Sequence, residues 1–287
     1  MAKVRIVTDS TATFEDPLLV HDYNITVVPL NIHFGDRVLR DGVDIDAEEM
    51  FHRLRRSPTP PRVSAPGVGA FAEVFQHLSR TTDQICVLLH SQHFTETYAN
   101  ALAARNAFMG RCEIAVIDSR TTSAALGYLV EAVAEAASMG ASLDEVVHLA
   151  RAVIPRLYSV FYVDTLDYIQ QADLIGETQA ILGTMLQIKP LLTIEDGLLI
   201  TMEKARTHAQ AIDKMIEFVA EFTDIERLCI LQGTLRITDR TRMLQDRLAL
   251  EFARLQSPLL LYTPLLATRI GPDGLGMAIL EGTGRDD

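Results

Sequence analysis

The same short phrase occurs twice in this chain and constrains its fold more than any other feature. Residues 4–11 read VRIVTDST, an apolar run that ends in Asp9 and Ser10, and residues 114–119 read IAVIDS, which ends in Asp118 and Ser119. A parallel strand that is buried on both faces appears in a sequence as a continuous apolar run. The two phrases therefore predict an α/β fold with a buried parallel sheet.

The polar residues that end these runs are the first candidates for a binding site. Ligands of open α/β folds bind at the carboxyl ends of the strands, and Ser10 and Ser119 would lie there. Ser91 follows a third apolar run, residues 85–89, in the same way. We therefore predict that these three serines bind a ligand. The alternative is that Asp and Ser only open the next turn or cap a helix, and this reading is favoured for any one copy alone.

Composition narrows the class of protein. Of the 287 residues, 48% are hydrophobic, which predicts a sizeable core. The balance of 26 basic against 38 acidic residues gives a net charge of −12 and argues against binding to nucleic acid or anionic membranes. No run approaches the roughly 20 apolar residues that cross a bilayer, and no signal peptide precedes the first strand. We expect a cytoplasmic protein with no stable membrane insertion, and the spacing of its three cysteines predicts neither a metal site nor a disulfide framework.

The pattern of apolar residues predicts two α/β domains, residues 1–158 and 159–287, divided near Pro155. The first would hold a parallel sheet flanked by helices, and the second would be a smaller mixed α/β domain. Expected strands of the first domain are 4–8, 26–34, 84–90 and 114–118, and its expected helices are 46–55, 69–79, 95–109, 124–139 and one that begins with a capping box at Ser142. Expected strands of the second domain are 160–163, 191–194, 198–202, 227–232, 259–264 and 276–281, with helices at 167–171, 177–185, 207–222 and 238–252.

Few residues carry a recognisable chemical motif. Arg269 opens a glycine-containing stretch between two expected strands, where it could form two hydrogen bonds to a carboxylate or phosphate, or simply face solvent. His90 and His93 lack the partners of a metal motif, and no GxSxG or Walker A sequence is present. Arg206 precedes an expected helix, where solvation is the default for an arginine.

A series of short phrases follows in a fixed order along nearly the whole chain. They are residues 6–12, 28–30, 41–42, 64–66 with Phe71, 95–98, 117–119 with Ser123 and Gly127, Leu166, 175–176, 188–190, 196–197, 206–207 and 270–272. In this order they resemble the DegV family of bacterial lipid-binding proteins. The resemblance implies a two-domain α/β protein that buries one long-chain fatty acid in an apolar tunnel between its domains.

The resemblance also implies how such a protein works. The carboxylate would be hydrogen-bonded near the surface and presented to a separate fatty acid kinase subunit, so the chain would need no catalytic residue and no cofactor. Thr95, Ser64 and Val63 match the family positions around the carboxylate, together with Arg269. Arg206 matches an exposed arginine that would contact the kinase.

The chain departs from the family pattern at several of these positions. Val63 stands where the family has threonine, Thr95 where it has serine, and Arg269 where it has histidine. Asp273 replaces a glycine, and residues 172–175 replace a Gly-Gly-Arg-Ile phrase. The carboxylate site is therefore expected to differ from that of its relatives.

Two other functions remain open. The first is an enzyme that acts on an acidic substrate, with Asp9, Asp118, Ser91 and Arg269 as its polar centre. The second is a regulatory protein in which lipid occupancy controls a partner.

Overall fold

The computed structural model describes residues 4–57, 60–164, 168–169 and 188–284, which form two compact units. Unit 1 consists of Met1–Ala47, Pro61–Pro155 and Asp196–Leu198, and unit 2 consists of Glu48–Pro60, Arg156–Glu195 and Leu199–Asp287. The expected helix at 177–185, most of the one at 167–171, and the phrases at 166 and 172–176 lie outside the described residues.

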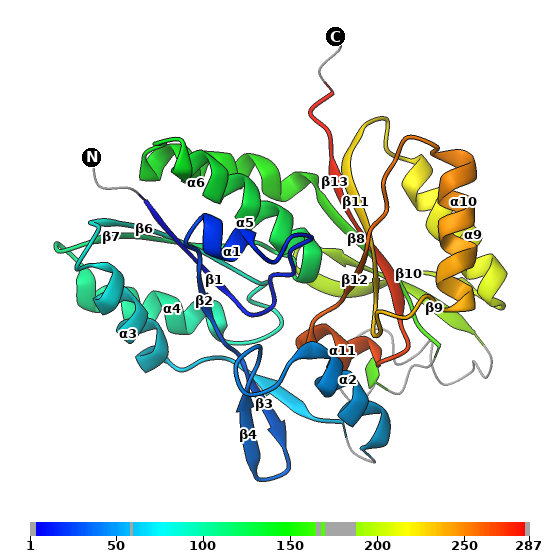
Figure 1. Cartoon of the computed structure of the whole chain (residues 1–287), viewed down its shortest axis with the longest axis horizontal. Coiled ribbons are helices and arrows are strands. Elements are labelled where there is room, and N and C mark those ends of the chain that lie inside the picture. The colour runs from blue at the N-terminus through cyan, green and yellow to red at the C-terminus, as the bar shows by residue number, and fades with distance from the viewer. Residues whose placement is uncertain (1–3, 58–59, 165–167, 170–187, 285–287) are drawn as a thin grey trace. The chain divides into compact units, whose positions relative to one another are not determined.

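Unit 1 is built on a four-stranded parallel sheet, as the repeated phrase predicts. The strand order is β2–β1–β6–β7, and the strands are β1 (Arg5–Asp9), β2 (Thr26–Val28), β6 (Gln84–Leu89) and β7 (Glu113–Asp118). Helices α3 (Val68–Leu78) and α4 (Thr97–Arg105) cover one face, and α5 (Ser123–Ser138) and α6 (Leu143–Val153) cover the other (Figure 1). The two inner strands, β1 and β6, are almost wholly buried because helices cover both faces of the sheet, and this architecture confirms the predicted fold class.

The core under α3 shows how the sequence sets this packing. Phe71, Phe75 and Leu78 recur at three- and four-residue spacing on α3 and are buried against the sheet. The last helix, α6, begins with the predicted capping box, in which the Ser142 hydroxyl and the Glu145 carboxylate each accept a backbone N–H.

The expected single strand 26–34 is wrong, because the chain leaves the parallel sheet at Pro29. Proline has no N–H to donate to a strand ladder, and the next strand, β3 (Asn31–Phe34), belongs to a different sheet. That three-stranded antiparallel sheet also holds β4 (Arg37–Arg40) and β5 (Arg62–Ser64). The proline and glycine at positions 66 and 67 predict a loop over residues 62–67, but Val63 and Ser64 lie in strand β5. A short helix, α1 (Leu19–Asp22), was also not predicted.

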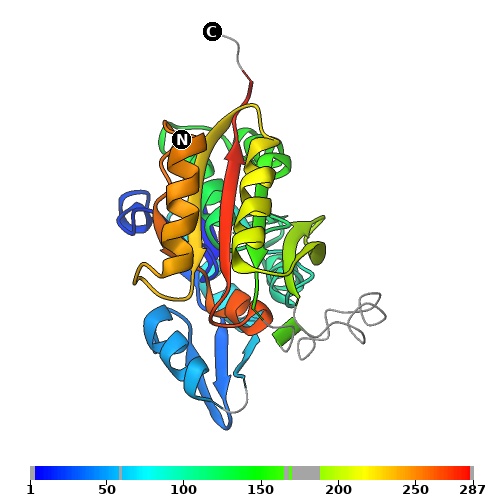
Figure 2. The same ribbon diagram turned by 90° about the vertical axis from the view of Figure 1, so that its right-hand side faces the viewer.

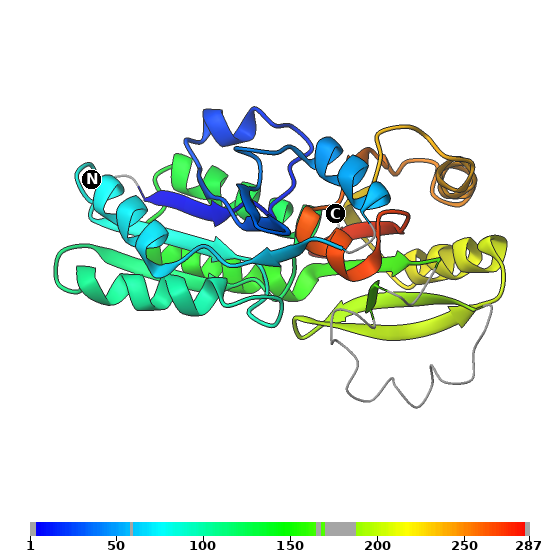
Figure 3. The same ribbon diagram turned by 90° about the horizontal axis from the view of Figure 1, so that it is seen from below.

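Unit 2 contains a six-stranded mixed sheet in the order β10–β9–β8–β13–β11–β12. Its strands are β8 (Leu157–Tyr162), β9 (Lys189–Glu195), β10 (Leu198–Ala205), β11 (Ile225–Gln232), β12 (Leu259–Leu261) and β13 (Leu275–Glu281). Helices α9 (His208–Ala220) and α10 (Asp239–Glu251) pack on one face, in front of β13 in Figure 2. The β9–β10 hairpin, yellow-green in Figure 3, turns at Asp196 and Gly197, which both have positive φ as the two-residue turn predicts.

A helix lies where the sequence predicts the end of a strand and a loop. The expected strand 259–264 is too long, and the expected loop around Arg269 is wrong. Strand β12 ends at Leu261, and α11 (Pro264–Ile270) begins after a Thr263 hydroxyl that accepts the Leu266 N–H. Proline fits the first helical position because no intrahelical N–H bond is needed there. Arg269 thus lies in the last turn of α11.

Helix α2 (Ala47–Arg56) groups with unit 2, although strands of unit 1 precede and follow it. Its buried face holds Met50, Phe51 and Leu54, and Phe51 packs edge-on against Tyr262 with ring centroids 5.1 Å apart. The described contacts divide the chain into two discontinuous units and do not test a single limit after residue 158. That domain limit remains a prediction.

Candidate functional site

The carboxyl edge of the parallel sheet in unit 1 carries a buried polar chain. Asp9 ends β1 and His90 directly follows β6, the neighbouring strand, and both side chains are fully buried. The His90 Nδ1 atom lies 2.9 Å from Asp9 Oδ2, and its Nε2 atom lies 2.9 Å from the Thr95 hydroxyl oxygen. Hydrogen-bond contacts thus run from the Asp9 carboxylate through the His90 imidazole to the hydroxyl of Thr95, whose side chain is half-buried.

The Asp9 carboxylate is held in its charged form. Burial acts to raise its pKa, but the charge of His90 and hydrogen bonds from His90 and Thr11 outweigh this, so that the pKa lies below its usual value. The backbone N–H groups of His90 and Thr11 each donate to it at 2.9 Å. A charged Asp9 accepts a hydrogen bond from Nδ1 of His90, so that nitrogen carries a proton.

Thr95 has further partners on the helix that follows it. Its oxygen lies 2.7 Å from the Thr97 hydroxyl and accepts the Thr97 N–H at 3.2 Å. Thr97 is the first residue of α4, so Thr95 lies next to the N-terminus of that helix.

Ser10 is paired with a second buried carboxyl group. Its hydroxyl donates to Asp41 at 2.7 Å and accepts the N–H of Leu30 at 3.0 Å. Burial raises the pKa of Asp41 to about 7, against the Ser10 hydrogen bond and with a further contribution from the charge of Asp9. Asp41 is not among the predicted site residues, because nothing in the Asp-Gly dipeptide indicates burial.

Ser64 is also paired with a histidine. Its hydroxyl lies 2.8 Å from Nε2 of His33 on the adjacent strand β3, and Val63 is half-buried opposite Ile32. The loop after β5 is tied to α4, since Asn100 donates to the carbonyl of Pro66. Ser64 and Thr95, the two hydroxyls that the resemblance places at the carboxylate, thus each contact an imidazole.

Ser91 and Ser119 are used in loops. The buried Ser91 hydroxyl donates to the Gly197 carbonyl at 2.7 Å, and Ser119 exchanges hydrogen bonds with the backbone of Thr121. Asp118 accepts the N–H groups of Gln92 and Arg120. Ligand contact by these serines remains a prediction, and the structure shows only their part in the loops.

The two predicted arginines belong to unit 2. Burial lowers the pKa of Arg269, which is half-buried on α11. Arg206 is exposed just before α9, where its N–H donates to Gln210. Their roles toward carboxylate and kinase remain predictions.

Unit 2 holds a charged cluster that no motif in the sequence indicates. Asp164 accepts hydrogen bonds from Lys189 at 2.8 Å and from Arg240, which also lies over the Tyr162 ring with its guanidinium carbon 5.8 Å from the centroid. Lys189 belongs to one of the phrases that resemble the family. Its contact with Asp164 gives a structural reason for a lysine at this position.

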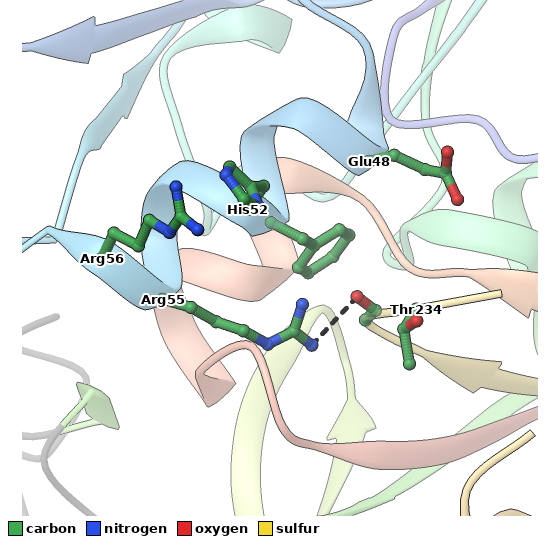
Figure 4. A pocket seen from close by; sticks show the side chains of 7 residues that line it. Glu48, His52, Arg55, Arg56 and Thr234 are labelled. Carbon is green, nitrogen blue, oxygen red and sulfur yellow. Dashed lines mark hydrogen bonds between the residues drawn. The ribbon is translucent and has the colours of Figure 1, made fainter. Parts of the chain in front are cut away.

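A pocket of about 240 Å³ lies between α2 and the loop after β11 (Figure 4). It is lined by Glu48, Phe51, His52, Arg55, Arg56, Gly233 and Thr234. The Arg55 guanidinium, drawn with a dashed line to the Gly233 carbonyl, donates to that carbonyl at 3.1 Å and to that of Pro272 at 3.0 Å. Since ligand pockets are usually larger and mainly apolar, this small basic pocket does not suit an acyl chain.

The described residues hold neither a candidate metal site nor a candidate membrane-spanning helix. They contain no cluster of histidine, cysteine and acidic side chains arranged to hold a metal ion. In the same part of the chain, no helix has the length and apolar character needed to traverse a bilayer.

Comparisons with known proteins agree with the resemblance seen in the sequence. The family profile "Uncharacterised protein, DegV family" matches residues 3–282. A DegV domain-containing protein of Caldanaerobacter subterraneus subsp. tengcongensis is 36% identical over 219 residues, 76% of this chain and 77% of the relative. One from Streptomyces coelicolor is 35% identical over 247 residues, 85% and 86% of the two chains.

A solved structure extends the likeness to the whole fold. It is described as the fatty acid binding of a DegV family protein from Thermus thermophilus, and it superposes with a TM-score of 0.85 at 25% identity. The match covers 98% of this chain and 100% of the Thermus protein.

Proposed function

The chain belongs to the DegV family, and from that premise we propose that it binds one long-chain fatty acid and presents its carboxylate to a partner kinase. The observation that carries the proposal is the likeness, over almost the full length of both chains, to a DegV protein described as binding fatty acid. An apolar tunnel for the acyl chain, as expected from the family, is part of this proposal.

The chemistry of the candidate site supports a carboxylate ligand. Thr95 and Ser64 each offer a hydroxyl beside an imidazole, and both are only half-buried. Hydrogen bonds to a charged group contribute about 1.5–3 kcal/mol each. Burial of an acyl chain adds about 0.8 kcal/mol for each methylene group, enough to keep a long-chain acid bound through purification.

In this proposal the partner kinase carries out the chemical reaction, which is phosphorylation of the bound fatty acid. The kinase would transfer a phosphoryl group to the bound carboxylate, so this chain would act as a carrier that needs neither a cofactor nor a catalytic residue. The exposed Arg206 is our candidate for the contact with the kinase, because a guanidinium pairs well with an acidic surface.

One observation favours a second candidate, an enzyme that cleaves or transfers acyl groups. Asp9, His90 and Thr95 follow one another as do the carboxylate, imidazole and hydroxyl of nucleophilic hydrolases. This centre differs from the one expected from sequence, since Asp118 and Ser91 are held in loops. A nucleophilic Thr95 requires His90 to accept its proton.

Native mass spectrometry of the purified protein, followed by lipid extraction, tests the proposal. The carrier predicts a mass increase of one long-chain fatty acid and no hydrolysis of fatty acyl esters. Ester hydrolysis that disappears in Thr95→Val would support the enzyme instead. An unloaded protein that also fails to take up any long-chain acid would overturn the proposed function.

A further inference from the structure

Asp9 and His90 have no role in the proposed function as stated above, yet they contact its central hydroxyl. We propose that Asp9 and His90 are positioning residues that turn the Thr95 hydroxyl into a donor toward an anionic headgroup, so that the site selects a fatty acid over the matching alcohol. This inference rests on the proposed function and adds the basis of its headgroup specificity.

The Thr95 hydroxyl has a single proton to donate. Its oxygen has three close partners, which are Nε2 of His90 and the hydroxyl and N–H of Thr97. The N–H of Thr97 can only donate. Either threonine hydroxyl can be the donor between the two, so the Thr97 hydroxyl can supply its own proton. Whether Thr95 has a proton left for a ligand therefore depends on what Nε2 of His90 requires.

The Asp9 carboxylate determines how His90 is protonated. Because Asp9 is charged and lies 2.9 Å from Nδ1, that nitrogen carries a proton. In the neutral imidazole Nε2 is then bare, and Thr95 donates its proton to it. In the imidazolium Nε2 donates instead, and the Thr95 proton is free to point at a ligand.

The two states treat two headgroups differently. A carboxylate only accepts hydrogen bonds, so Thr95 can bind it only when His90 is protonated. An alcohol can also donate to the Thr95 oxygen, and it can therefore bind in either state. Binding of the acid anion should thus take up a proton at His90, and the affinity for the acid should fall as pH rises, whereas that for the alcohol should not.

Two carboxyl groups enter the test besides His90. Asp9 lies at the end of β1, and Asp41, in the segment after β4, lies close enough to Asp9 for the two charges to interact. Phe94 presents an aromatic ring 6.5 Å from the imidazole centroid. Since Asp41 itself has a pKa of about 7, any test must separate its titration from that of His90.

Isothermal titration calorimetry of the delipidated protein in buffers of different ionisation enthalpy measures the proton uptake directly. Palmitate and hexadecanol serve as the matched ligands. We expect a net uptake of protons when palmitate binds, and none when hexadecanol binds. Carboxyl ¹³C NMR of bound palmitate checks that the ligand stays ionised, and Asp41→Asn should retain the uptake.

Two variants of His90 form a matched pair. The amide of asparagine reaches about as far as Nδ1, and that of glutamine about as far as Nε2. His90→Asn should lose the contact with Thr95 and weaken palmitate binding about tenfold or more while changing hexadecanol binding less than about twofold. His90→Gln should retain palmitate binding without proton uptake and without its pH dependence.

The outcomes separate this inference from the function on which it rests. Failure of the wild type to bind palmitate would overturn the proposed function and the inference together. Binding without proton uptake, uptake by the palmitate carboxylate itself, or an equal loss of acid and alcohol in His90→Asn would overturn the inference alone. The calorimetry with palmitate and hexadecanol uses the wild-type protein. It therefore decides between these outcomes even if both His90 variants fail to fold.

Discussion

A Cβ atom on Gly127 would lie 1.9 Å from the carbonyl oxygen of Thr13, so helix α5 meets the loop after β1 at a distance that only glycine allows. The loop is held there by a further backbone bond from the Thr13 N–H to the Ser123 carbonyl. Gly127 belongs to one of the phrases that this chain shares with the family. Its close contact with Thr13 explains why a glycine is needed at this position.

Gly127→Ala should destabilise unit 1 by about 1–3 kcal/mol or more, because backbone must move to admit the methyl group. Gly69→Ala on α3 is the matched control, since a Cβ there meets nothing within 4 Å. Alanine has a higher helix propensity than glycine, so this variant should not lose stability. Thermal unfolding of the two variants checks this. A Gly127→Ala protein as stable as Gly69→Ala would contradict the packing.

Asp41 should make stability depend on pH. Its pKa of about 7 in the folded state lies above that of an unfolded aspartate, 3.8. The resulting stabilisation is present below about pH 4 and is lost as pH rises to about 7. Asp41→Asn should therefore raise stability relative to wild type more at pH 8 than at pH 5, by on the order of 1–3 kcal/mol.

Denaturant unfolding at both pH values measures this difference, with Asp36→Asn as the control for an exposed carboxyl group. The same difference in both variants, or none in Asp41→Asn, would show that Asp41 does not titrate in this window.

Much of the fold could be predicted from the sequence because its central strands are long and apolar. Strand β6 carries an unbroken apolar run over residues 85–89, and β1 and β7 carry shorter apolar runs that end in an aspartate. Strand β5 has only three residues, Arg62–Ser64, too few to show alternation. The start of α11 was detectable, since threonine followed by proline is typical of a helix N-terminus.

The candidate site was predictable in its position but not in its contacts. That Asp9 and His90 follow strands was visible, and so was the expectation that such residues meet at the sheet edge. Their pairing requires that β1 and β6, some 80 residues apart in sequence, be neighbours in the sheet. Strand order is a property of the whole fold, and no local pattern encodes it.

Arg269 should discriminate between acid and alcohol if it supplies the positive charge that relatives provide with histidine. Arg269→Ala is then expected to weaken fatty acid binding about tenfold or more, with little effect on the matching alcohol. Paired titrations of the two ligands measure this. An equal loss for both would show that Arg269 supports α11 and does not contact the carboxylate.

Arg206 should affect the kinase step without affecting lipid binding. Arg206→Ala leaves the fold and the lipid site unchanged in our account, because the side chain is exposed. Phosphorylation of the bound acid by a cognate kinase should fall severalfold, while the dissociation constant of the acid stays within about twofold. Loss of lipid affinity in this variant would place Arg206 at the ligand instead.

The central claim is that this chain binds a single long-chain fatty acid, and titration of the delipidated protein with palmitate tests it most directly. We predict saturable binding of one palmitate per chain, detected by calorimetry and confirmed by native mass spectrometry of the same sample. No saturable binding of palmitate, stearate or oleate, with the protein shown to be folded, would contradict the account.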